Sequence, residues 1–155
     1  MGQRTAIVTG AGKRVGRVLA EGLLSDGWKV VAHVHRETDG VPEGATRVVA
    51  DLAEPDCAER IMGACLEAPA LLVNNAARFA HDDLEEFSTA EFDLHMAVNV
   101  RAPALLTAAF ASLASARNDR LVVNILDAKL YGQNPDFLSY TLSKAALACL
   151  TEVSA

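Results

Sequence analysis

The sequence predicts one α/β domain, residues 1–155, built as a doubly wound parallel sheet with helices on both faces. Two observations lead to this class. Short, wholly apolar strands alternate with helical patterns, which is typical of strands that helices bury on both sides. No repeat, low-complexity segment or linker interrupts this order, and 155 residues suffice for one domain with a sizeable core.

The first half of the chain predicts three strands and a helix. Residues 5–9 form a short apolar run that ends in glycines, and residues 29–34 and 46–50 are further short strands. Residues 15–26 predict a helix, because Val15, Val18, Leu19 and Leu23 recur on one face and Gly27 ends the pattern.

The second half continues the alternation. We expect a helix at residues 56–68 closed by Pro69, a strand at 71–73, two helical pieces within 89–116, and a strand at 121–125. A last helix begins at Tyr140. No glycine stop or closing strand follows it, so we expect the C-terminal part of the fold to be missing from this chain.

Composition argues against several classes of function. A net charge of −6 argues against nucleic-acid partners, because phosphate backbones attract basic surfaces. Residues 1–4 lead directly into a strand, and no apolar run approaches the ~20 residues of a membrane span, so we expect a cytoplasmic protein without a membrane partner. Three cysteines without C-x-x-C spacing predict free thiols. The isolated His81 and His95 predict no metal site.

Glycines lie between the first predicted strand and the first predicted helix, in Thr9-Gly-Ala-Gly-Lys-Arg-Val-Gly16. Gly10 and Gly12 permit a tight turn and the close approach of a pyrophosphate, and Gly16 lets the helix start pack against the sheet. The helix N-terminus adds amide donors and partial positive charge. The segment therefore predicts a dinucleotide site in a Rossmann-type sheet.

The second predicted strand ends in His33-Val-His35-Arg36, where folds that prefer NAD place an acidic residue for the ribose 2′-hydroxyl. His35, Arg36 and Arg14 offer donors and positive charge instead, and a guanidinium suits a phosphate better than a neutral diol. This pattern favours NADP(H), the alternative being that Arg36 is a solvated strand-end charge. Glu37 would oppose a 2′-phosphate if its side chain pointed inward.

Tyr140 and Lys144 lie four residues apart at the start of the last predicted helix, so they share one face. A tyrosine with a pKa of about 10 is a poor acid–base group at neutral pH. An ammonium about 4 Å away favours the phenolate by roughly 4 kcal/mol at an effective dielectric near 20, which brings that pKa close to neutrality. We therefore expect Lys144 to lower the pKa of Tyr140.

These motifs, in this order, resemble the classical short-chain dehydrogenase/reductase family along nearly the whole chain. The resemblance implies that Asp51 and Leu52 border the adenine ring, and that Asn99 holds a water linking Lys144 to solvent. It also implies that Lys144 hydrogen-bonds the nicotinamide ribose and that Asn75 and Ala76 line the cofactor. The cofactor-binding residues that we expect are Gly10, Gly12, Arg14, Val15, Gly16, His35, Arg36, Asp51, Leu52, Asn75, Ala76, Tyr140 and Lys144.

Asp127 stands thirteen residues before Tyr140, where the family has a catalytic serine that donates to a substrate carbonyl. An ionised aspartate cannot donate, so Asp127 is either protonated or orients Tyr140 and a substrate N–H. Pteridine reductases, a subgroup of the family, are similar in this aspartate, in the G-A-x-K-R-x-G loop and in His-x-His-Arg. Phe79 falls where they stack an aromatic residue on the pterin, with loop packing as the alternative. Ala77 and Glu37 depart from the subgroup.

We therefore expect hydride transfer from a nicotinamide to a C=N or C=O carbon of a small-molecule substrate. Tyr140 would donate the proton, Lys144 would lower its pKa, Asn99 would support the relay, and Asp127 would orient the reacting group. The alternatives are an ordinary ketone or sugar reductase and a non-catalytic NADP(H)-binding module.

The remaining polar residues predict little chemistry. Asp82-Asp83 and Glu85-Glu86 predict a solvated loop and helix start, and Arg78 a surface charge. Ser139 and Ser143 lack a partner histidine, which argues against a hydrolase. The apolar face of the last helix, which includes Leu142, Leu150 and Val153, predicts a homo-oligomer, either a dimer or a tetramer.

Overall fold

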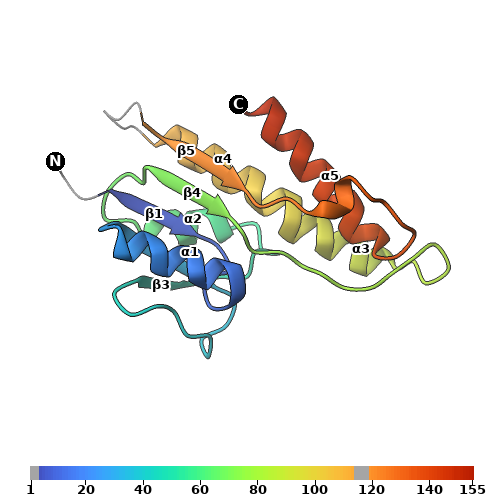
Figure 1. The fold of residues 1–155 in the computed structure, drawn as a ribbon, viewed down its shortest axis with the longest axis horizontal. Coiled ribbons are helices and arrows are strands. Elements are labelled where there is room, and N and C mark those ends of the chain that lie inside the picture. The colour runs from blue at the N-terminus through green and yellow to red at the C-terminus, as the bar shows by residue number, and fades with distance from the viewer. Residues whose placement is uncertain (1–3, 114–118) are drawn as a thin grey trace.

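The computed structural model describes residues 4–113 and 119–155 and confirms a parallel five-stranded sheet flanked by helices (Figure 1). The strand order is β3-β2-β1-β4-β5, and all neighbouring strands run parallel. The chain steps outward from β1 to β3 and then returns to place β4 on the other side of β1. Ligands of such sheets bind at the carboxyl ends of the strands, at this switch point.

The elements of the first half lie close to their predicted ranges. They are β1 (Thr5–Val8), α1 (Arg14–Ser25), β2 (Lys29–Val34), β3 (Thr46–Val49) and α2 (Cys57–Gly63). The helix α2 is shorter than the predicted 56–68. The amides of Ala64 and Cys65 bond only three residues back, to Ile61 and Met62, and this tight turn closes the helix.

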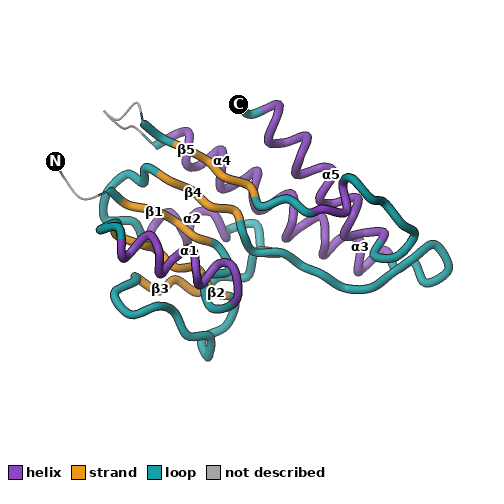
Figure 2. Tube along the Cα trace, in the orientation of Figure 1, coloured by secondary structure: helices purple, strands orange, loops and turns teal. Residues whose placement is uncertain are grey.

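The second half contains β4 (Leu71–Asn74), α3 (Thr89–Met96), the π-helical turn η1 (Ala97–Arg101), α4 (Ala102–Ser112), β5 (Leu121–Asn124), the 3-10 helix η2 (Ala128–Leu130) and α5 (Leu138–Val153). The two pieces predicted within 89–116 are α3 and α4, and residues 114–116 of that range lie outside the described residues. The sequence did not predict η2, and α5 begins two residues before Tyr140. Figure 2 shows the loops after β4 and after η2 at the same end of the molecule.

Apolar cores on both faces of the sheet hold the helices in place. Ile7 and Leu72 pack with Leu106 of α4 on one face. Val8 packs with Ala20 of α1 on the other face. Successive strand residues point to opposite faces, so the central strands β1 and β4 are buried on both sides, as the sequence predicts. The edge strand β3 begins with the exposed Thr46 and Arg47.

One helical stretch, Thr89–Ser112, is long and apolar enough to cross a membrane by length and composition alone. The sequence pattern alone predicts no such run. A core helix passes the same test, and 39% of the most apolar window is buried inside the molecule, against α2 and α5. The stretch is therefore only weak support for a membrane span.

Candidate active site

The glycine-rich segment forms a tight loop at the carboxyl end of β1. Gly10 has a left-handed φ of +66°, and a Cβ there would lie 3.0 Å from Cα of Ala76. Gly12 follows in the same turn. Gly16 lies in the first turn of α1, where a Cβ would overlap the carbonyl oxygen of Gly10 and Nδ2 of Asn75. The backbone contacts leave no room for a side chain at Gly16.

The N-terminus of α1 can accept an anion. Among the described residues, the N-cap Lys13 makes no side-chain cap and the first turn of α1 carries no acidic residue. Arg14 and Val15 are exposed in that turn, and His35 and Arg36 are exposed just after β2. Amides at a positive helix end, with guanidinium groups nearby, suit the phosphates of a dinucleotide. The predicted residues fit such a group, and their contact with it stays a prediction.

His33 joins the phosphate loop to the sheet, a role that its sequence context did not reveal. Its buried ring accepts from the Gly10 amide through Nδ1 at 3.1 Å and donates through Nε2 to the carbonyl oxygen of Ala50 at 3.0 Å. These partners require the neutral Nε2–H tautomer. Burial lowers the pKa of His33, which keeps the ring neutral.

The residues after β2 have polar partners of their own. Arg47 of β3 forms an ion pair with Glu37, with Nη2 and Oε2 2.7 Å apart, and Nη1 donates to the Glu37 carbonyl oxygen. The charge that would oppose a phosphate is therefore paired. Asp51 is exposed, with Oδ1 3.9 Å from Nδ1 of His35. Leu52, predicted to border the adenine, is buried in the core.

Asn75 and Ala76 hold the loop after β4 against the phosphate loop. The amides of both residues donate to Oγ1 of Thr9 at 3.0 Å. The side chain of Asn75 donates to the Thr9 carbonyl oxygen at 2.9 Å. The two segments that the family resemblance assigns to the cofactor thus meet at the carboxyl ends of β1 and β4.

Tyr140 and Asp127 meet beyond the carboxyl end of β5. Tyr140 donates its hydroxyl to Oδ2 of Asp127 at 2.6 Å, and Oδ1 accepts from the Lys129 amide at 2.8 Å. The hydrogen bond from Tyr140, followed by that from Lys129, lowers the pKa of Asp127, so the carboxyl group is ionised and accepts. Of the two roles that the sequence left open, this geometry supports orientation of Tyr140.

The expectation that Lys144 lowers the pKa of Tyr140 is wrong for this structure. Burial, followed by the hydrogen bond to Asp127, raises the pKa of Tyr140 well above its usual range. The ammonium of Lys144 donates to the carbonyl oxygen of Ile125 at 2.7 Å and lies 5.8 Å from the centre of the Tyr140 ring. Burial also lowers the pKa of Lys144. Burial of the phenol and a carboxylate bonded to its hydroxyl therefore outweigh an ammonium directed at another acceptor.

Asn99 lies in η1, and π-helical turns are frequent at functional sites. Its buried amide donates to the carbonyl oxygen of Arg78 at 2.9 Å and to Oγ of Ser143 at 2.8 Å. Its Oδ1 accepts from the Arg78 amide at 2.7 Å. These bonds tie the loop after β4 to α5. The predicted water-mediated relay to Lys144 stays a prediction.

Phe79 is 58% exposed and lies against Tyr140. The two rings meet edge to face with centroids 4.7 Å apart, and Phe79 also stacks on Phe137 at 4.4 Å with 8° between the planes. Phe137 precedes α5 at a left-handed φ of +59°, which is uncommon for a bulky residue. The sequence does not identify Phe137, because nothing local indicates its conformation or its distant partner.

The sequence predicts both Asp82 and Arg78 at the surface. Arg78 is an exposed charge as predicted, whereas Asp82 is not. Asp82 is buried, and its carboxylate accepts from the amide of Ser139 at 3.0 Å and from the Ser139 hydroxyl, so the solvated assignment is wrong. Arg78 donates to both carboxylate oxygens of Glu91, at 2.7 and 2.8 Å, and this pairing raises its pKa. Residues 4–113 and 119–155 contain no group of three His, Cys, Asp or Glu side chains that could hold a metal ion.

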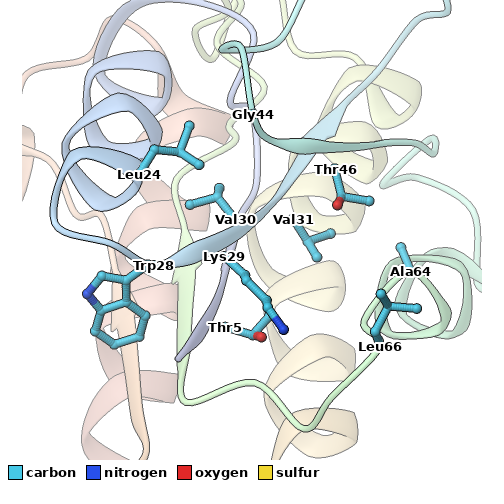
Figure 3. A pocket seen from close by; sticks show the side chains of 10 residues that line it. All are labelled: Thr5, Leu24, Trp28, Lys29, Val30, Val31, Gly44, Thr46, Ala64 and Leu66. Atoms are coloured by element: carbon cyan, nitrogen blue, oxygen red, sulfur yellow. The ribbon is translucent and has the colours of Figure 1, made fainter. Parts of the chain in front are cut away.

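A cavity of about 300 Å³ lies at the other edge of the sheet, beside Trp28, Thr46 and Leu66 (Figure 3). Thr5 and Lys29, which begin β1 and β2, also line it. Among the residues that the structure describes, none of those that line this cavity is a predicted site residue. The chemically active groups therefore gather at the carboxyl edge, away from this cavity.

Curated proteins similar to this chain are oxidoreductases. Residues 4–155 match the family model described as short chain dehydrogenase. The chain is 32% identical to L-xylulose reductase of Bos taurus over 158 residues, which cover 98% of this chain and 64% of that protein. It is 31% identical to gluconate 5-dehydrogenase of Gluconobacter oxydans, covering 95% of this chain and 62% of that protein. The chain thus spans less than two thirds of these relatives.

Solved structures share the fold over nearly the whole chain. FolM alternative dihydrofolate reductase 1 from Brucella suis, in complex with NADP, is 33% identical with a TM-score of 0.84, covering 97% of this chain and 68% of that one. A short-chain dehydrogenase from Streptomyces avermitilis is 28% identical with a TM-score of 0.86, covering 98% of this chain and 59% of that one.

Proposed function

We propose a function from the premise that the chain belongs to the short-chain dehydrogenase family: it is an NADP(H)-dependent oxidoreductase that reduces a C=N or C=O bond. The observation that carries the proposal is the 2.6 Å hydrogen bond from the Tyr140 hydroxyl to Asp127. This proton donor lies at the carboxyl edge of the sheet, which also carries the phosphate loop. An acid group at that edge can protonate a substrate beside a bound dinucleotide.

The cofactor that we propose is NADP(H). Arg14 and Arg36 offer two exposed guanidinium groups for a 2′-phosphate. The ion pair with Arg47 neutralises Glu37, the acidic residue that would favour NAD. Further support comes from the two Brucella FolM structures, 33% and 32% identical to this chain, which were solved with NADP. When bound, the nicotinamide supplies the hydride.

In the proposed reaction Tyr140 gives its proton to the nitrogen or oxygen of the substrate, and the adjacent carbon gains the hydride. The raised pKa keeps Tyr140 protonated through neutral pH, so the donor form is populated before each turnover, although it also makes this phenol a weaker acid than an ordinary tyrosine. Asp127 holds the hydroxyl oxygen in place, which lowers the entropic cost of proton transfer, and the O–H bond would turn from the carboxylate to the substrate atom that takes the proton. Lys144 would hold the nicotinamide ribose, and Asn99 would support the return of a proton to Tyr140.

The substrate class that we propose is a planar, nitrogen-bearing ring such as a dihydropteridine. The ionised Asp127 can accept from a ring N–H, which a serine hydroxyl does less well. Phe79 offers an exposed aromatic ring for stacking beside Tyr140. The FolM neighbours are described as alternative dihydrofolate reductases. An ordinary sugar or ketone reductase is the second candidate, favoured by the 32% identity to L-xylulose reductase.

The decay of nicotinamide absorbance tests this function. NADPH should be consumed with a dihydropteridine faster than with L-xylulose or a simple ketone. Asp127→Ser should lower the turnover of the dihydropteridine more than that of the ketone, because only the ring presents an N–H. A uniform loss would count against that role. Tight NADPH binding without turnover of any substrate would favour the non-catalytic module.

The assembly state that we propose is a dimer or tetramer of this chain. Leu142 and Val153 on α5 are 47% and 76% exposed, an apolar surface that a second copy would cover. Light scattering should report more than one copy per particle. A monomer with full turnover would contradict this assembly. The cytoplasmic location stays a prediction.

A further inference from the structure

Asp82 lies in the loop after β4, but its carboxylate is buried at the N-terminus of α5. The residue is only 2% exposed. Oδ1 accepts from the Ser139 amide at 3.0 Å, Oδ2 accepts from the Ser139 hydroxyl, and the backbone carbonyl oxygen accepts from the Leu138 amide at 3.1 Å. Three hydrogen-bond donors in the first turn of α5 therefore bond to Asp82, which lies 57 residues before Ser139 in the sequence.

The helix α5 depends on this external cap, because its own sequence supplies none. Within the described chain, the N-cap Phe137 makes no side-chain hydrogen bond and the first turn carries no acidic residue. The first amides of a helix have no partner within it, and they carry partial positive charge. The Asp82 carboxylate supplies both the missing acceptor and the complementary charge.

We propose that Asp82 is a positioning residue that sets Tyr140 against Asp127 and Phe79. Tyr140 directly follows Ser139, and Phe79 lies three residues before Asp82, so one carboxylate fixes both segments. The closeness of the two rings, with centroids 4.7 Å apart, is the result. The inference rests on the proposed function, because it requires Tyr140 to be the proton donor.

Other bonds between these segments act further along the helix. Asn99 bonds Ser143 and the Arg78 backbone, which anchors the second turn of α5. The Ala80 amide bonds Nε2 of His95, which anchors the loop to α3. Loss of the Asp82 carboxylate should therefore loosen the first turn, which carries Tyr140, and leave the rest of α5 in place.

The variants Asp82→Ala and Asp82→Asn test this role, with Asp83→Ala as the matched control. Asp83 lies in the same loop and accepts from the amides of Glu85 and Glu86 rather than from α5. Asp82→Ala should lower kcat about tenfold, the effect of about 1.4 kcal/mol in the barrier, and leave the KM for NADPH unchanged. Asp82→Asn keeps an acceptor for the Ser139 amide and should recover most of the loss. Asp83→Ala should keep parental kcat.

Ultraviolet titration of tyrosine gives a readout that does not need turnover. The chain has two tyrosines, Tyr140 and the 94% exposed Tyr131. In the parent, Tyr140 should ionise above about 10, the ordinary pKa of tyrosine, because burial and the bond to Asp127 raise its pKa. In Asp82→Ala, Tyr140 loses its fixed bond to Asp127 and its pKa should fall toward the ordinary value for tyrosine, while circular dichroism shows an unchanged helix content.

Parental kcat and parental tyrosine titration in Asp82→Ala would overturn the proposal, as would an equal loss in Asp83→Ala. If Asp82→Ala does not fold, Ser139→Ala takes its place. That variant removes only the hydroxyl donor and should lower kcat two- to threefold, by about 0.5 kcal/mol. If the parent turns over no substrate, the proposed function fails, whereas the tyrosine titration still decides the role of Asp82.

Discussion

The phosphate loop and the proton-donor region are held in place by different means. Between β1 and α1, Gly10 and Gly16 touch neighbouring atoms so closely that backbone shape fixes the loop. Around α5, side-chain hydrogen bonds fix the positions of the residues. Asp82 bonds Ser139, Asn99 bonds Ser143 and Asp127 bonds Tyr140, each from another segment of the chain. Polar bonds from His33 and Asn75 also reach the phosphate loop. The difference is that only the phosphate loop adds backbone contacts that exclude a side chain, whereas the region around α5 depends on polar bonds to distant residues.

This difference predicts how each region responds to change. A substitution in the phosphate loop should act through overlap of atoms, and should damage the fold and cofactor binding together. A substitution near α5 should act through charge and proton position, and should damage turnover while the fold persists. The predictions that follow test this contrast, from the largest expected effect to the smallest.

Tyr140→Phe should lower kcat by about 10³-fold, because the phenol supplies the proton. Its hydroxyl bonds only to Asp127 among the described residues, so NADPH binding and thermal stability should stay near parental values. Steady-state kinetics and fluorescence titration measure the two quantities. Tyr131→Phe is the control, because that side chain is 94% exposed. Equal losses in both variants would remove Tyr140 from the mechanism.

Gly16→Ala should destabilise the protein by about 3 kcal/mol and abolish NADPH binding, because its Cβ overlaps the Gly10 carbonyl oxygen. Gly22→Ala in the same helix meets no atom within 4 Å. It should be neutral or stabilise the helix by up to ~1 kcal/mol. Urea unfolding compares them. Similar stability of the two variants would contradict the steric account of this loop.

Arg36→Asp should weaken NADPH binding about tenfold, by ~1.4 kcal/mol, and reverse the preference toward NADH. Arg47→Ala should have a smaller effect of the same sign, because it leaves the Glu37 charge unpaired. The double variant Glu37→Ala with Arg47→Ala should recover the parental affinity for NADPH. Titration of both cofactors by fluorescence measures this, and tighter NADH binding by the parent would refute the NADP preference.

Stability should fall as the pH drops below about 6.5, the ordinary pKa of histidine. Burial lowers the folded-state pKa of His33, so the unfolded chain binds the proton more readily and acid favours unfolding. Protonation would also remove the acceptor for the Gly10 amide. The variant His33→Gln should lose part of this pH dependence, an effect of about 1 kcal/mol in urea unfolding between neutral and mildly acidic pH. An unchanged slope would contradict this role.

The fold and the phosphate loop could be predicted because their signals are local. Apolar runs identify the strands, and the spacing of Gly10, Gly12 and Gly16 identifies the loop without knowledge of the fold. These features depend on residues that lie close together or at a fixed spacing along the chain. Orientation of Tyr140 by Asp127 was one of two roles that the family resemblance left open, and spacing alone did not predict it.

The polar bonds around α5 could not be predicted, because they join residues far apart in the sequence. In the sequence, Asp82 is typical of a solvated loop residue. Only the folded chain brings Ser139 into contact with its carboxylate. The direction of the Tyr140 pKa shift was mistaken for the same reason. Spacing identifies Lys144 as the charge one helical turn away. The folded chain instead buries the phenol of Tyr140, bonds its hydroxyl to Asp127 at 2.6 Å and turns Lys144 toward Ile125.

Transfer of deuterium from cofactor to product tests the central claim most directly. The parent is incubated with a dihydropteridine and with NADPH that carries deuterium at the transferable nicotinamide position. Mass spectrometry then measures the mass of the product. The proposed reaction places one deuterium on the reduced carbon, and Tyr140→Phe should form almost no labelled product although it binds the cofactor normally. Unlabelled product from the parent, or full labelling by Tyr140→Phe, would contradict hydride transfer assisted by Tyr140.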